Sequence, residues 1–128
     1  MGSSLRPRFT IDVAGQPYQF AQPFVQPFLE LAEDPAQYQV PVPADDSALV
    51  WDGTIPFSTF DFLALQSDRD LTMTFEVSNG ASTFVLELRG GGFPIVIPKN
   101  SNITQIDAAN TDTDNDAVLT VFIAQAAS

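Results

Sequence analysis

Three aspartates stand at every second position in the stretch "NTDTDNDAVL" near the end of the chain. Asp112, Asp114 and Asp116 match the first, third and fifth positions of an EF-hand calcium loop, whose oxygen ligands surround a hard cation. The pattern then fails, because Ala117 replaces the glycine of the bend and Ile123 replaces the bidentate glutamate. The sequence therefore favours an acidic turn between strands over a metal site, with a weak cation site as the alternative.

Other side chains that could do chemistry are few. The chain has no histidine and no cysteine, which excludes Ser-His-Asp and Cys-His nucleophile arrangements. Two carboxylates can hydrolyse glycosides when they face each other across a cleft, but Glu76 and Glu87 fall on the polar sides of neighbouring predicted strands. The single lysine, Lys99, has no serine motif beside it. We therefore expect a protein that is not an enzyme, with no catalytic residues and no cofactor.

The only tryptophan, Trp51, lies in "ALVWDGT" beside an Asp-Gly turn. An exposed indole there could stack on a sugar, which would make the chain a carbohydrate-binding module. A tryptophan at the end of an apolar run is more typical of a hydrophobic core. Trp51 is therefore the possible glycan contact under the alternative function, that of a carbohydrate-binding module.

Proline and aromatic residues dominate the N-terminal part of the chain. Eight of the ten prolines lie within the first 56 residues, so this part cannot form a regular central sheet. Its stretch "QPYQFAQPFVQPF" carries Tyr18, Phe20, Phe24 and Phe28, and disordered linkers are poor in aromatics. These side chains form either an arm that docks on a partner subunit or a strap on the chain's own sheet. We expect one domain, with residues 1–56 as an arm and peripheral strands and residues 57–128 as the core.

The charge balance is strongly acidic. Five cations stand against sixteen acids, for a net charge of −11, and residues 9–68 contain no cation. Such a surface repels phosphate backbones and anionic lipids, so neither nucleic acid nor membrane is an expected partner. The chain also shows no signal-peptide pattern and no apolar run long enough to cross a membrane.

The second half shows the period-two alternation of β-strands. "DLTMTFEV" and "TFVLELR" flank Asn79-Gly80, which supplies the two positive φ angles of a type I′ hairpin turn. Further strands are expected over residues 38–43, as an edge strand, and over 60–67, 93–98, 101–106 and 117–124, with a short helix as the alternative for 60–67. Residues 28–34 favour one or two helical turns. The last strand is apolar on both faces, so something must cover its second face. The sequence predicts an all-β fold, an antiparallel β-sandwich or jelly roll.

Within residues 60–125, the motifs "SDRDLT", "FPIVIP" and "NTDTDNDAVLTVFIA" give a pattern that resembles small β-sandwich accessory proteins of tailed-bacteriophage virions. The resemblance implies a capsid decoration (cement) protein on the capsid surface, soluble before assembly and frequently a homotrimer. Its partners would be copies of itself and the major capsid protein or other virion subunits. The alternatives are a carbohydrate-binding β-sandwich and a phage tail or adhesin component.

Overall fold

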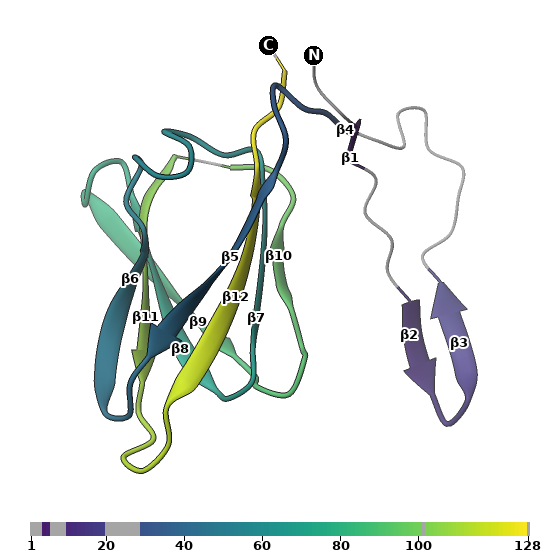
Figure 1. The fold of residues 1–128 in the computed structure, drawn as a ribbon, viewed down its shortest axis with the longest axis vertical. Helices are drawn as coiled ribbons and strands as arrows, with labels where there is room; N and C mark the ends of the chain where they lie inside the picture. The colour runs from purple at the N-terminus through teal and green to yellow at the C-terminus, as the bar shows by residue number, and fades with distance from the viewer. Residues whose placement is uncertain (1–3, 6–9, 20–28, 101, 128) are drawn as a thin grey trace.

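The computed structural model describes residues 4–5, 10–19, 29–100 and 102–127, and all regular elements in these ranges are β-strands (Figure 1). Within them, no helix is long and apolar enough to cross a membrane. The strands are β1 (Ser4–Leu5), β2 (Thr10–Val13), β3 (Gln16–Gln19), β4 (Leu29–Glu30), β5 (Ala36–Val42), β6 (Asp46–Trp51), β7 (Phe62–Ser67), β8 (Leu71–Val77), β9 (Ser82–Leu88), β10 (Ile95–Ile97), β11 (Ile103–Asn110) and β12 (Ala117–Ala124).

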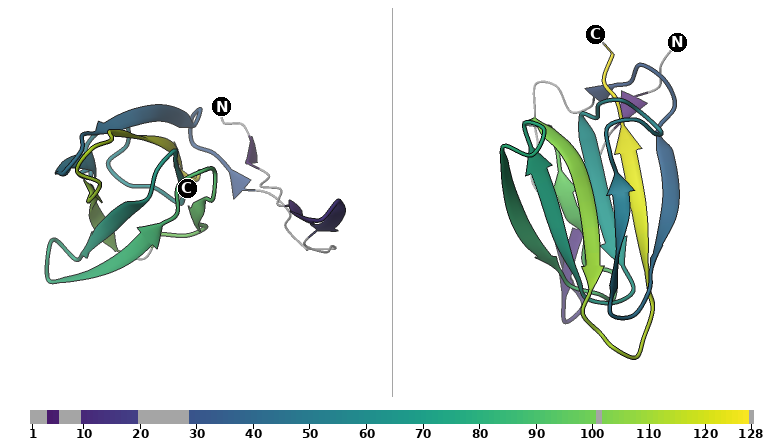
Figure 2. Two further views of the ribbon diagram at one scale, coloured as in Figure 1. Left: turned by 90° about the horizontal axis from the view of Figure 1, so that it is seen from below. Right: turned by 90° about the vertical axis from the view of Figure 1, so that its left-hand side faces the viewer.

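Eight of these strands form two four-stranded antiparallel sheets. One sheet has the order β10-β7-β12-β5 and the other has the order β6-β11-β8-β9. The pairs β5–β12, β6–β11, β7–β10 and β8–β9 succeed one another as a long double strand rolled into two layers, which is the jelly-roll arrangement (Figure 2). The expected all-β sandwich is confirmed.

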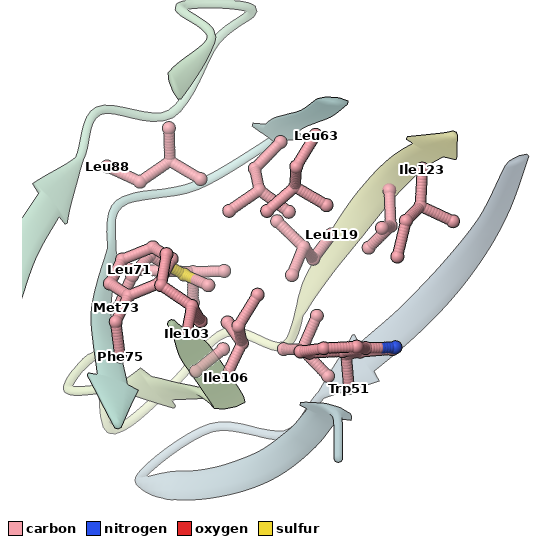
Figure 3. Close-up of a cluster of buried hydrophobic side chains, with 14 of the residues drawn as sticks. Trp51, Leu63, Leu71, Met73, Phe75, Leu88, Ile103, Ile106, Leu119 and Ile123 are labelled. Atoms are coloured by element: carbon pink, nitrogen blue, oxygen red, sulfur yellow. The ribbon is translucent and has the colours of Figure 1, made fainter. Parts of the chain in front are cut away.

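The core lies between the two sheets and follows from the alternation in the sequence. In β8 the residues Leu71, Met73 and Phe75 are at most 2% exposed, while the threonines between them lie on the outer face. β12 contributes Leu119 and Ile123 from the opposite sheet, both fully buried (Figure 3). Period-two apolar residues on paired strands thus supply both walls of one core.

The hairpin of β8 and β9 has the expected turn. Asn79 and Gly80 have φ angles of 57° and 90°, and the Ala81 N–H donates to the Ser78 carbonyl at 3.3 Å, which closes a type I′ turn. Val77 pairs with Ser82, so the loop between the paired strands is four residues long. Its first residue, Ser78, also has a positive φ, of 53°.

The second face of β12 is covered at one end by the N-terminal strands. Leu31, Phe62 and Ala124 form a small buried cluster, against which Leu5 and Leu29 pack. The backbone ties the same region together in three places: an isolated bridge joins Leu31 to Ala126, the Ala32 N–H donates to Gln125 O, and the Ala127 N–H donates to Glu30 O. β1 and β4 therefore cap this sheet from outside.

One expectation from the proline-rich part changes. Residues 29–30 form a strand rather than the expected helical turns, because pairing and burial of the two leucines beside Glu30 outweigh local helix propensity. β5 and β6, which come from the part expected to give an arm and peripheral strands, are outer strands of the two sheets. β5 tolerates Pro41 because it is the edge strand of its sheet, as the pattern of residues 38–43 predicted.

Candidate functional site

The acidic loop of residues 111–116 connects β11 to β12, and two of its three aspartates bind backbone. The Asp112 carboxylate accepts hydrogen bonds from the N–H groups of Asp114 and Asn115, at 2.9 and 3.2 Å. Asp116 accepts one from the Ala44 N–H at 3.0 Å. Asp112 therefore binds backbone within its own loop, whereas Asp116 binds the backbone of the connection between β5 and β6. Across the part of the chain that the structure describes, no three acidic side chains gather as a metal-binding group.

Asn110 anchors the start of this loop. It is 2% exposed, its side-chain amide donates to the carbonyls of Val42 and Asn115, and its Oδ1 accepts from the Asp112 N–H. The hydrogen bond from Asp114 N–H, then that from the Asn115 side chain, hold the pKa of Asp112 below its ordinary value, and the charge of Arg69 adds to this effect. The loop geometry thus favours the ionised carboxylate.

Replacing Asp112 with asparagine should destabilise the protein at neutral pH, because the charged acceptor of this loop is lost. A lowered folded-state pKa means that the contribution is complete above the unfolded pKa and disappears as the pH falls through the folded pKa. The stability difference between wild type and Asp112→Asn should therefore shrink toward zero in acid, as measured by urea unfolding at pH 7 and at about pH 2.5, below the ordinary aspartate range. Asp114→Asn is the control, since the exposed Asp114 side chain accepts no hydrogen bond from the described residues. An equal loss at both pH values would contradict this role of the charge.

An open cleft of about 620 Å³ lies beside the same loop, lined by Asp68, Arg69, Asp70 and Asp112 among others. The acidic side chains of this cleft accept hydrogen bonds from backbone N–H groups. Asp68 accepts from the Val118 N–H at 2.9 Å and Asp70 accepts from the Gly90 N–H at 2.7 Å. This cleft is the meeting point of three connecting loops, and its acidic side chains are committed to fixing them.

The remaining polar candidates also have structural roles. Glu87 accepts a hydrogen bond from the Thr72 hydroxyl, its cross-strand partner, at 2.6 Å. Glu76 pairs with Thr83 across the same two strands. Both carboxylates therefore lie on the outer face of the β8–β9 ladder and not across a cleft. Lys99 is exposed in the segment that follows β10.

Trp51 lies inside the sandwich. Its side chain is 2% exposed, its ring meets Phe60 edge to face at 5.1 Å between centroids, and its Nε1–H donates to the Phe57 carbonyl at 3.0 Å (Figure 3). A buried indole needs such an acceptor for its N–H. With both ring faces packed, Trp51 presents no face on which a sugar could stack.

The aromatic residues assigned to a docking arm lie outside what the structure describes. Phe20, Phe24 and Phe28 belong to an undescribed segment, and Tyr18 is described only as a backbone position of β3. The neighbouring backbone forms the hairpin of β2 and β3, which stands apart from the sandwich in Figure 1 and in the left view of Figure 2.

Strand β9 is the most exposed apolar element of the sandwich. Phe84, Val85 and Leu86 are consecutive and are 39%, 55% and 39% exposed. Phe84 and Leu86 pair with the fully buried Phe75 and Met73 of β8, so they belong to the core-facing side of the sheet. They remain exposed because the sandwich is open on this side, where the opposite sheet ends in the short strand β10.

The other side of the sandwich is closed. The Tyr38 hydroxyl on β5 donates to the Val50 carbonyl on β6 at 2.9 Å, which joins the two edge strands. Burial, and then the nearby charge of Asp52, raise the pKa of Tyr38 above its ordinary value, which keeps this donor protonated. The sandwich is therefore closed at the margin between β5 and β6 and open at the margin between β9 and β10. Figure 2 shows the β8–β9 hairpin at the edge of the molecule.

Of the four edge strands in the two sheets, β9 is the longest that contains no proline. β5 carries Pro41, and β10 has three residues and stands between Pro94 and Pro98. β6 begins with Asp46 and is joined to β5. β9 has seven residues, no proline and one charged residue, Glu87. The sequence does contain three consecutive apolar residues in this strand, Phe84, Val85 and Leu86. The alternation of the strand, however, is equally typical of an ordinary edge strand with one buried face.

No family model matches the chain, and no curated protein matches it. Among solved structures, the chain is similar to a protein of Bacillus endospore appendages, described as a novel family of disulfide-linked pili. The TM-score is 0.44 and the identity is 13%, over 73% of this chain and 89% of that chain. At this identity the likeness concerns the fold. The present chain contains no cysteine and cannot form such disulfide links.

This comparison corrects the expectation drawn from the virion resemblance. The similar structure is that of an appendage pilus protein and not of a capsid decoration protein, so the expected cement function is wrong. The expected capsid-surface location and the capsid partners are wrong with it.

Proposed function

We propose that the chain is a non-enzymatic structural subunit that assembles with copies of itself, and that β9 is the strand through which copies meet. A single observation carries this proposal: β9 is a long, proline-free edge with three consecutive exposed apolar side chains. An edge strand presents unpaired N–H and C=O groups to any extended chain, and soluble proteins usually block such edges with proline, charge or bulges. This long proline-free edge with its exposed apolar side chains is therefore the strand best suited to be an interface.

The rest of the surface supports assembly over binding of small molecules. The acids that line the cleft beside the acidic loop hold loop backbone, and Trp51 is packed in the core. Among the described residues, Phe84, Val85, Leu86 and Phe93 are four of the seven large exposed apolar side chains, and they lie on β9 and in the segment between β9 and β10. The guanidinium of Arg89 lies 6.0 Å from the Phe93 ring, at the polar end of this surface. An apolar centre with a charged rim is the usual composition of a protein–protein interface.

The first test is the mass of the wild-type chain in solution. Light scattering after size-exclusion chromatography should show a mass above that of one chain, increasing from about 1 μM to about 1 mM, the range in which contacts worth about 4–8 kcal/mol appear. Negative-stain electron microscopy of the same samples would distinguish closed oligomers, including the expected trimer, from filaments. A strictly monomeric chain over the whole range would overturn the proposal.

A further inference from the structure

Among the described residues, two elements have a strand edge with no paired neighbour, and one is suited to the other. The first is the edge strand β9. The second is the hairpin of β2 and β3, which stands away from its own sandwich (Figures 1 and 2). An isolated two-stranded hairpin is at best marginally stable in water, so this hairpin needs a sheet or a further strand to pack on.

We propose that the β2–β3 hairpin of one copy adds to β9 of a second copy, so that the sheet β6-β11-β8-β9 continues into the hairpin of the neighbour. This inference rests on the self-association proposed above and names the segment that occupies the open edge. Strand addition of this kind draws its affinity from main-chain hydrogen bonds and its selectivity from the side chains that alternate along the added strand.

The backbone favours β2 as the added strand. β2 (Thr10–Val13) contains no proline and has an N–H at every residue, whereas β3 contains Pro17. β9 contains no proline either, so each residue of both strands can donate to a ladder. In the sequence of β2, Ile11 and Val13 alternate with Thr10 and Asp12, which is the pattern of a strand with one apolar face. Such a face would cover the exposed core side of β9.

The contact has a consequence for symmetry. The donating surface is the hairpin and the accepting surface is β9, so the interface is heterologous. Interfaces of this type close into rings or continue as filaments, according to the rotation between neighbours. The same contact could thus build either form, and the microscopy proposed above would show which one.

The test uses full-length chains with single introduced cysteines, which is clean because the natural sequence has none. A tagged copy carries Thr10→Cys and an untagged copy carries Val85→Cys. By strand alternation, these positions share the face opposite the apolar one. A short flexible bismaleimide, which tolerates an offset of a residue or two, should link the two copies. The matched control is Leu49→Cys on β6, the other edge of the same sheet, with 51% exposure against 55% for Val85. We expect linking to Val85→Cys at least about tenfold faster than to Leu49→Cys, because docking raises the local concentration of one thiol at the other.

Each other outcome overturns the inference. Equal rates, or a faster reaction with Leu49→Cys, would mean that the hairpin does not seek β9. A Thr10→Cys/Val85→Cys double variant that links within one chain at high dilution would mean that the hairpin packs on its own sandwich. If the wild type associates in light scattering and either result is found, only the hairpin assignment fails. If the wild type is monomeric, the proposed function fails as well.

Discussion

A chain carrying Trp51→Ala should lose about 3–5 kcal/mol of its unfolding free energy, the range for deleting a large buried aromatic side chain. The indole is 2% exposed and meets Phe60 edge to face, so its removal leaves a cavity between the sheets. The Phe57 carbonyl also loses its donor. Urea unfolding followed by far-ultraviolet circular dichroism would measure the loss, since the variant has no tryptophan fluorescence.

Trp51→Phe separates the two contributions. A phenyl ring fills much of the site but cannot donate to Phe57 O, so this variant should lose less than Trp51→Ala, about 1–3 kcal/mol for an acceptor left without its hydrogen bond. A Trp51→Ala chain within about 1 kcal/mol of wild type would contradict the buried position, because that is the size of an ordinary surface change.

Replacing Val85 with lysine should weaken self-association several-fold while leaving the fold intact. Val85 is 55% exposed in the single chain, so the change should shift unfolding free energy by no more than about 0.5 kcal/mol. Val85 lies on the outer face of β9, beside the strand that a second copy would add, so lysine would lose an apolar cross-strand contact worth about 0.2–1 kcal/mol. Lysine on an edge is also the device that many sheets use against pairing. Light scattering gives the association, and urea unfolding of the same sample gives the stability.

Leu49→Lys provides the matched control on the opposite edge of the sheet. Its side chain is 51% exposed, and β6 is already joined to β5 through Tyr38. We expect Leu49→Lys to assemble as the wild type does. Equal loss in both variants would show that added positive charge alone disrupts the assembly and that β9 is not the contact strand.

Much of the fold follows from local sequence. The alternation in residues 71–77 places Met73 and Phe75 in the core, and Asn79-Gly80 sets the turn that follows. Such features depend on neighbours one or two residues away, which is why period and turn chemistry identify them. The place of the acidic turn between two strands was likewise readable, because a polar run precedes the apolar residues of the last strand.

Other features depend on contacts that are distant in sequence. Leu29 and Leu31 sit in a stretch with helix propensity, and only the sheet beneath them makes that stretch extended. Asn110 appears in the sequence as one more polar residue of an acidic turn. Its burial against Val42, 68 residues away, makes it the anchor of that turn.

The sequence by itself determined that this chain is an acidic all-β sandwich without histidine or cysteine chemistry, because composition and strand period are local properties. Only the tertiary structure decided which apolar residues remain outside. "TFVLELR" has the same alternation whether its strand is covered or not, and its exposure follows from the end of the opposite sheet at the short strand β10. Edge position is a property of the assembled sheets, and it turns Phe84, Val85 and Leu86 from expected core and surface residues into the candidate interface.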